Sequence, residues 1–116
     1  MPNWQPNWKD VVWDWGVAND AVRALQRAAD LLDATAGERS NRSQAATAEW
    51  RGRYRDNFEG ELRRILTRSR DLATHYREIA SRISQASQRA HDEQKDRERE
   101  RQRWWRQYWA EQAGRD

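Results

Sequence analysis

Two long runs of apolar residues with a helical repeat organise the chain. In the first run, apolar side chains recur at alternating steps of three and four residues from Trp8 to Ala36, and the same spacing reaches Trp50. The second run restarts one residue out of step at Phe58 and continues to Ala90. A period near 3.5 residues is typical of helices packed along a seam, not of strands. The pattern therefore predicts an all-α chain with two long helices.

The larger apolar residues of both runs are the candidates for the contact between the helices and for contact with a partner. They are Val22, Leu25, Leu32, Leu62, Ile65, Leu72, Tyr76, Ile79 and Ile83. Alanines at positions 18, 29 and 36 lie among them and allow a neighbouring helix to approach closely. Gly37 costs the first helix about 1 kcal/mol relative to alanine, which allows fraying or a bend.

The break between the two runs predicts a turn near residues 50–55. Drift between the 3.5 and 3.6 periods can also shift a pattern by one residue, so the turn needs a second signal. Gly52 supplies it, because glycine adopts positive φ at little cost where a chain leaves one helix for another. Asp56 and Glu59 follow, where negative charge favours a helix start. We expect a long antiparallel helix-turn-helix hairpin over residues 8–94.

Residues 1–7 are expected to form an extended arm, because the sequence Pro-Asn-Trp-Gln-Pro-Asn-Trp at positions 2–8 places two prolines four residues apart. Asn7, with Asp10 three positions on, is a candidate cap that would start the first helix near Trp8. Asn19, which follows Gly16, is a competing start.

Residues 95–116 are expected to form a charged, tryptophan-rich helical tail. Between Asp92 and Arg103 acids and bases alternate, and pairs three residues apart predict a solvated helix with weak ion pairs. These pairs are Asp92 with Lys95, Asp96 with Arg99, Arg97 with Glu100 and Glu98 with Arg101.

The tail also carries one aromatic patch, made of Trp104, Trp105, Tyr108 and Trp109. The first helix is too short to cover the second beyond about residue 94 at 1.5 Å per residue. An extended arm at about 3.3 Å per residue reaches further, so we expect Trp4 to lie near Trp104. The patch then either caps the bundle, docks another protein or touches a membrane interface, and the sequence favours the first two.

Composition limits what a single copy of this chain can do. Of 116 residues, 36% are hydrophobic and 35% are charged, so one hairpin buries only a narrow face and should need a partner. No window approaches the ~20 apolar residues of a membrane span. The N-terminus has neither the basic start nor the apolar core of a signal peptide. The absence of cysteine excludes disulfides, thiol catalysis and sulfur-ligated metals.

Trp50-Arg51-Gly52 lies between the two helical patterns, and Phe58 follows eight residues after the tryptophan. With these residues the chain resembles the WXG family of early-secreted-antigen-like proteins of type VII (ESX) secretion, over about residues 10–95. The resemblance implies that Trp50 and Gly52 form the turn motif and that Phe58 is the first core position after it. It also implies a coiled-coil hairpin that pairs with a second WXG-like hairpin, as a homodimer or heterodimer, into a four-helix bundle.

The resemblance further implies export of the folded dimer by a membrane-embedded secretion ATPase, with this chain as substrate or chaperone-like partner. The protein would then be cytoplasmic before export and secreted or at the cell surface afterwards, by a route independent of a signal peptide. The family's export signal, a tyrosine with an acid four residues later, is absent at Tyr108, because Gln112 occupies that position. Either the partner carries this signal or the chain stays inside.

Enzymatic and nucleic-acid functions are the competing classes. His75 and His91 are sixteen residues apart with no acid at metal-binding spacing, and no phosphate-binding loop is present, so we expect no catalysis, metal or cofactor. Nucleic-acid binding is the second hypothesis, because the turn region has a local excess of arginine. These arginines are Arg51, Arg53, Arg55, Arg63, Arg64, Arg68 and Arg70. The sequence favours pairing of these arginines with acids on a partner.

Overall fold

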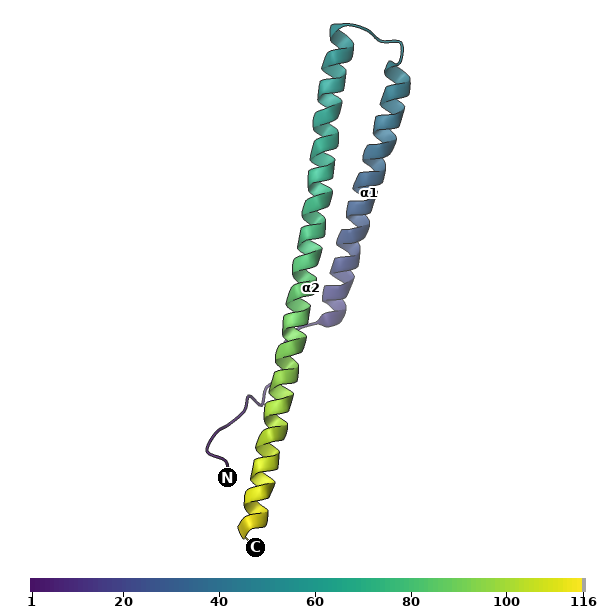
Figure 1. Cartoon of the computed structure of the whole chain (residues 1–116). Helices are drawn as coiled ribbons and strands as arrows, with labels where there is room; N and C mark the ends of the chain where they lie inside the picture. Colours follow the sequence, from purple (N-terminus) through teal and green to yellow (C-terminus); the bar gives the residue numbers. More distant parts are fainter. Residues whose placement is uncertain (116) are drawn as a thin grey trace.

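A computed structural model of the chain describes residues 1–115, and it contains two helices and no strand within this range. Helix α1 spans Trp15–Thr47 and helix α2 spans Arg53–Arg115. They run antiparallel, and α2 continues well beyond the start of α1 (Figure 1). The prediction of an all-helical hairpin is confirmed. The predicted tail 95–116 continues α2 without a break, and its last residue, Asp116, lies outside the described residues.

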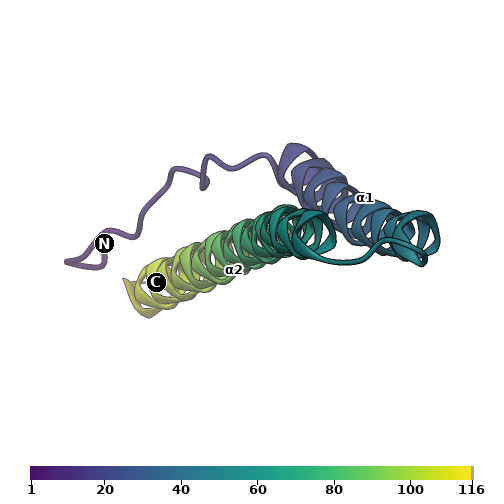
Figure 2. The same ribbon diagram turned by 90° about the horizontal axis from the view of Figure 1, so that it is seen from above.

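Helix α1 starts at Trp15, between the two starts that the sequence suggested. Its cap is Asp14, whose side chain accepts a hydrogen bond from the backbone N–H of Val17 at 3.0 Å. Asn7 does not cap a helix, because its side chain accepts the backbone N–H of Lys9 in a local turn. The extended arm therefore covers residues 1–14 and is longer than predicted. Figure 2 shows it leaving α1 and crossing to the far end of α2.

The turn occupies residues 48–52, at the early edge of the predicted region. Gly52 has a φ of 85°, the left-handed conformation that glycine adopts at little cost. The Trp50 N–H donates to the Thr47 carbonyl at 2.9 Å, and the Asp56 N–H donates to the Gly52 carbonyl at 3.2 Å. These two bonds end α1 and begin α2. Gly37 neither ends α1 nor interrupts it.

Small residues make the closest contact between the two helices. Ala29 and Ala73 are fully buried, and Ala36 and Ala80 are nearly so. No large side chain among residues 1–115 is fully buried. Because the helices approach through alanine, the larger apolar residues lie at the edges of the contact and remain partly exposed.

The inner face of α2 is a single line of residues spaced 3.5 apart. Its members are Leu62, Leu66, Ser69, Ala73, Tyr76, Ala80, Ile83, Ser87 and Ala90, all buried or half-buried. Ile65 and Leu72, which the sequence pattern placed in the seam, lie one position to the side and are 45% and 40% exposed. The apolar pattern spans two adjacent lines, and the structure places the line of smaller residues innermost.

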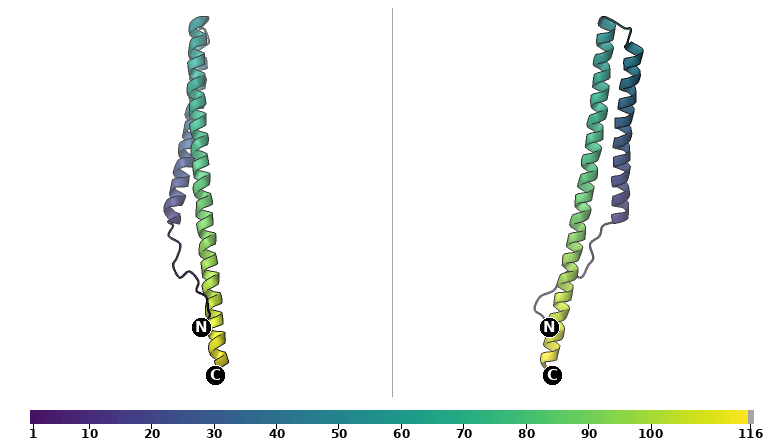
Figure 3. Two further views of the ribbon diagram at one scale, coloured as in Figure 1. Left: turned by 90° about the vertical axis from the view of Figure 1, so that its left-hand side faces the viewer. Right: turned by 45° about the vertical axis from the view of Figure 1, so that its right-hand side comes forward.

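The molecule is a thin rod, 96 Å long and 19 by 14 Å across (Figure 3). Its accessible surface is 9254 Å². A compact monomer of 13.9 kDa would expose about 6,700 Å² by the usual size scaling, so the rod exposes roughly 2,600 Å² more. No helix among residues 1–115 is both long and apolar enough to cross a membrane.

Candidate functional site

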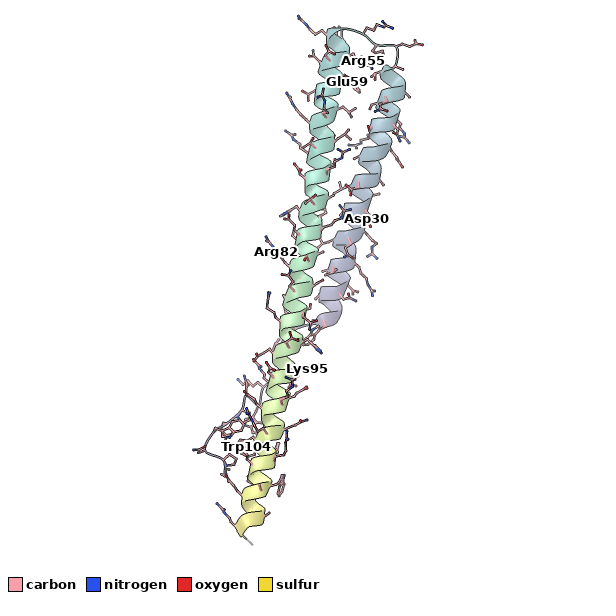
Figure 4. The ribbon with its side chains drawn as sticks, viewed as in Figure 1. Asp30, Arg55, Glu59, Arg82, Lys95 and Trp104 are labelled. Atoms are coloured by element: carbon pink, nitrogen blue, oxygen red, sulfur yellow. The ribbon has the colours of Figure 1, made fainter. Side chains whose placement is uncertain are left out.

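The hairpin end of the rod is built around Trp50 and Phe58. Their ring centroids are 5.5 Å apart with planes at 72°, an edge-to-face contact that closes the turn over the start of α2. Arg55 donates to the Trp50 carbonyl at 3.2 Å. It also donates to the Glu59 carboxylate at 2.9 Å, and both side chains lie near the start of α2 (Figure 4). Trp50 nevertheless stays 46% exposed. The turn therefore positions a tryptophan at the tip without burying it.

Tyr54 adds a second exposed aromatic ring to this end. It is 87% exposed and lines a shallow hollow with Trp50 and Arg51. Arg53 is exposed beside it, and residues 1–115 provide neither Arg51 nor Arg53 with an ion-pair partner. By contrast, Arg64 pairs with Glu61 at 2.9 Å.

One flank of the inner line of α2 is apolar. It comprises Phe58, Ile65, Leu72, Ile79 and Ala86, spaced seven residues apart, and we call it the apolar flank. Its first three members are between 36% and 45% exposed. The matching positions of α1 are Ala21, Ala28 and Thr35, which are half-buried. This side of the hairpin offers small and apolar groups from both helices.

The opposite flank is polar, and ion pairs of one arginine cross it to α1. It comprises Arg63, Arg70, Arg77, Ser84 and His91. Arg77 reaches across to α1 and donates to Asp33 at 2.7 Å and to Asp30 at 3.0 Å. The hydrogen bond from the guanidinium to Asp33 raises the pKa of Arg77 most, and the hydrogen bond to Asp30 raises it further. In an antiparallel helix pair, the flanking positions of the two helices meet on the same side of the contact. The contact of Arg77 with Asp30 and Asp33 therefore marks one side of the hairpin, and the apolar flank lies on the other.

The overhang of α2, residues 91–115, carries a second site in which the arm lies along the helix. Trp104 is 5% exposed, and its centroid lies 5.3 Å from that of Trp8 at a nearly perpendicular angle. Its indole N–H donates to the Trp4 carbonyl at 2.9 Å, while the Trp4 indole N–H donates to the Gln107 side chain at 2.7 Å. The predicted meeting of the N-terminal and C-terminal tryptophans is confirmed.

Polar side chains of the overhang bind the backbone of the arm. Arg101 donates to the carbonyls of Asn7 and Lys9 at 2.9 and 2.6 Å, and Arg97 donates to the Lys9 carbonyl at 3.1 Å. Gln94 accepts the Val11 N–H at 2.8 Å. An extended chain has unpaired N–H and C=O groups, and these side chains satisfy them.

Asp10 completes this contact with its side chain. Its carboxylate accepts a hydrogen bond from Gln94 at 3.0 Å and pairs with Arg101 at 2.8 Å. These bonds, first the one from Gln94 and then the one from Arg101, hold the pKa of Asp10 below its ordinary value, and the charges of Arg101 and Arg97 act in the same direction. The carboxylate therefore favours the ionised form when the arm is docked.

The charged segment 92–103 is only partly the ion-pair ladder that the sequence predicted. Asp96 and Arg99 pair at 3.3 Å as expected. Arg97 pairs instead with Glu93, and Arg101 pairs with Asp10 of the arm. The reason is that Arg97 and Arg101 lie on the inner line of α2 and meet the arm. Sequence reasoning missed these arm-binding residues, although continuing the 3.5-residue spacing past Ala90 would have found them.

The other predicted docking residues surround Trp104. Tyr108 stacks on Trp104 with centroids 5.4 Å apart and planes at 11°. Trp105 and Trp109 continue the cluster and are 45% and 62% exposed. The aromatic patch is therefore half covered by the arm and half open.

The two histidines of the chain both lie on α2, sixteen residues apart. Residues 1–115 contain no group of three or more histidines, cysteines or acids placed to hold a metal ion. His75 and His91 are exposed on α2, and His91 lines a shallow hollow between the helices with Trp15 and Ser87.

Comparison with protein-family models, curated proteins and solved structures finds no match.

Proposed function

We propose that this chain is a non-enzymatic interaction module that works by pairing its hairpin with a second hairpin. The observation that carries the proposal is the difference between the two flanks of the α1–α2 contact. One flank is polar and is bridged by Arg77 to Asp30 and Asp33, while the apolar flank has neither such a bridge nor a covering element among residues 1–115. A surface of this kind favours contact with another apolar helix surface.

The amount of exposed surface supports the same proposal. A typical stable interface buries about 800 Å² on each partner. The excess over a compact chain of this mass, roughly 2,600 Å², is larger than one such interface requires. Pairing along the apolar flank would give Phe58, Ile65 and Leu72 the burial that a single hairpin does not provide. A four-helix bundle is the simplest architecture that meets this need.

The more specific form of the proposal is a WXG-like partner in type VII secretion. Trp50, Gly52 and Phe58 support it, because the glycine turns the chain with positive φ while the two rings pack together at the tip. In this proposal the second hairpin is another copy or a related WXG-like chain, a secretion ATPase recognises the pair, and the pair leaves the cytoplasm together. The chain serves as substrate or chaperone-like partner.

Measurement of mass in solution tests the pairing. We expect sedimentation at micromolar concentration to give about twice the 13.9 kDa chain mass, for the protein alone or after co-expression with a neighbouring gene product. The double substitution Ile65→Ser and Leu72→Ser should shift the mass towards one chain. Leu31→Ser is the control, because Leu31 is 68% exposed and lies away from the apolar flank. A folded monomer under both conditions would contradict the proposal.

Nucleic-acid binding is a second candidate, favoured by the tip of the hairpin. Arg51 and Arg53 lie beside the exposed rings of Trp50 and Tyr54, and basic groups interleaved with aromatic rings suit single-stranded nucleic acid. Binding of labelled single-stranded DNA that weakens steeply with salt would support this function. A dimer that does not bind DNA, and whose dimerisation does not change with salt, would support pairing of the hairpins alone.

A further inference from the structure

The overhang of α2 and the arm are related as a receptor and its ligand. No hydrogen bond between backbone atoms joins the arm to α2 within residues 1–115, and every bond between the two uses at least one side chain. The arm has no helix or strand of its own. Val12, close to the junction with α1, is 99% exposed. Val11 and Trp13 on either side of it are half-buried, and the Trp13 indole N–H donates to the Ser87 hydroxyl at 3.0 Å. The arm is thus an extended segment docked on α2 through side chains.

The residues on the inner line of α2 change in chemical character where the neighbour of α2 changes from α1 to the arm. Along α1 the line carries mainly small and apolar residues, which suit a helix whose backbone groups are already paired. Beyond Ala90 the same spacing places Gln94, Arg97, Arg101 and Trp104 on the line. All four bind backbone atoms of the arm. This face of the overhang is built to recognise an extended chain.

The arm supplies a short repeated motif to this face. Both prolines of the repeat, Pro2 and Pro6, are buried, and each is followed two residues later by a tryptophan that reaches Trp104. The guanidinium of Arg103 lies 5.4 Å from the Trp4 ring centre, in position for a cation–π contact. Trp104 therefore contacts the arm at Trp4 and Trp8, and polar side chains of the overhang bind the arm between and beyond these two residues.

We propose that the overhang is a binding site for extended segments carrying two tryptophans four residues apart, each preceded by Pro-Asn, and that the arm occupies this site in cis. The docked arm is then an autoinhibitory ligand. When the arm leaves, Trp104 and the arginine side chains are open to a segment of the same chemistry supplied by another molecule. Trp105 and Trp109, exposed beside the arm, extend the surface available to it. This proposal does not depend on pairing of the hairpins.

A peptide with the sequence of residues 1–11 provides the probe, with Lys9→Gln so that trypsin leaves it intact. The full-length double variant Trp4→Ser and Trp8→Ser, with its arm weakened, should bind the labelled peptide at least tenfold more tightly than the wild-type chain does. Adding Arg101→Gln to this variant should weaken binding again. A peptide with both tryptophans replaced by serine is the ligand control. Leu31→Ser is the protein control, because Leu31 is 68% exposed on α1, which does not reach the overhang.

Equal binding of the peptide by the wild-type chain and the double variant, or binding by neither, would overturn the proposal. A second measurement uses the wild-type chain, so it remains informative if the double variant loses helix. In the wild-type chain, excess peptide should displace the arm and accelerate trypsin cleavage after Lys9, whose carbonyl Arg97 and Arg101 otherwise hold. Cleavage that is insensitive to the peptide would contradict displacement.

Discussion

Arg101 binds the arm at more points than any other side chain described. Its three guanidinium nitrogens donate to the carbonyl of Asn7, the carbonyl of Lys9 and the carboxylate of Asp10. The side chain is 19% exposed, so much of its surface lies against the arm. A planar fork of fixed donors suits three acceptors presented by one extended segment. A lysine at this position would offer a single ammonium in place of this fork.

Acid should release the arm through Asp10. Because docking lowers the pKa of Asp10, the contact is stabilised when pH exceeds the ordinary aspartate pKa near 3.9, and this stabilisation is lost as pH falls through the lower docked value. We expect tryptophan fluorescence to shift towards that of exposed indole below about pH 4. Asp10→Asn should remove most of this pH dependence, and Asp20→Asn, outside the arm, should not. An unchanged profile in Asp10→Asn would assign the transition to other carboxylates.

At the scale of elements, the two helices differ in what holds them. Helix α1 has a cap, a small-residue contact with α2 and a tight turn after it. Helix α2 is 63 residues long, and α1 accompanies only part of it. The remaining length, about 37 Å at 1.5 Å per residue for the overhang, is accompanied by the arm over most of its extent (Figure 1). The arm thus replaces α1 as the neighbour of the overhang.

The turn between the elements makes a paired test with two glycines. Gly52→Ala should destabilise the chain by about 1–2 kcal/mol, because the alanine must adopt the left-handed conformation at φ 85°. Gly37→Ala should stabilise it by up to about 1 kcal/mol, because Gly37 lies inside α1 and an added Cβ meets no atom within 4 Å. Urea unfolding followed by circular dichroism measures both. Equal effects of the two substitutions would contradict the role given to Gly52.

At the scale of the whole molecule, length and thinness dominate. The radius of gyration is 27.5 Å, about twice the ~13 Å of a compact domain of this size. A rod of two helices has too little interior to bury a large side chain fully. A partner that covered the apolar flank along the hairpin would therefore add burial that the single chain lacks.

Pairing of two copies should make the melting temperature depend on concentration. When a dimer unfolds to two separate chains, each tenfold dilution removes about 1.4 kcal/mol of stability per dimer. We expect the melting temperature to fall by about 3–5 °C per tenfold dilution. Ile65→Ser with Leu72→Ser should lower the melting temperature and remove this dependence. A constant melting temperature in the wild-type chain would indicate a monomer or a partner of another kind.

The sequence by itself determined the two helices, the turn at Gly52 and the approach of Trp4 to Trp104. Periodicity, glycine and the lengths of helix and extended chain are local or additive properties, and they suffice for these features. The start of α1 was not determined, since Asn7, Asp14 and Asn19 all have side chains able to cap a helix.

Only the tertiary structure decided which of two adjacent apolar lines on α2 faces α1. It also decided which residues pair with the charged side chains of the overhang. Helices approach most closely through Ala29 and Ala73, so Ile65 and Leu72 move to the side and leave an open apolar flank. Arg101 binds Asp10 in place of Glu98 because the arm presents backbone acceptors along the same face. Periodicity places Arg101 on the inner line of α2, but its pairing with Asp10, about ninety positions away, depends on how the arm packs there.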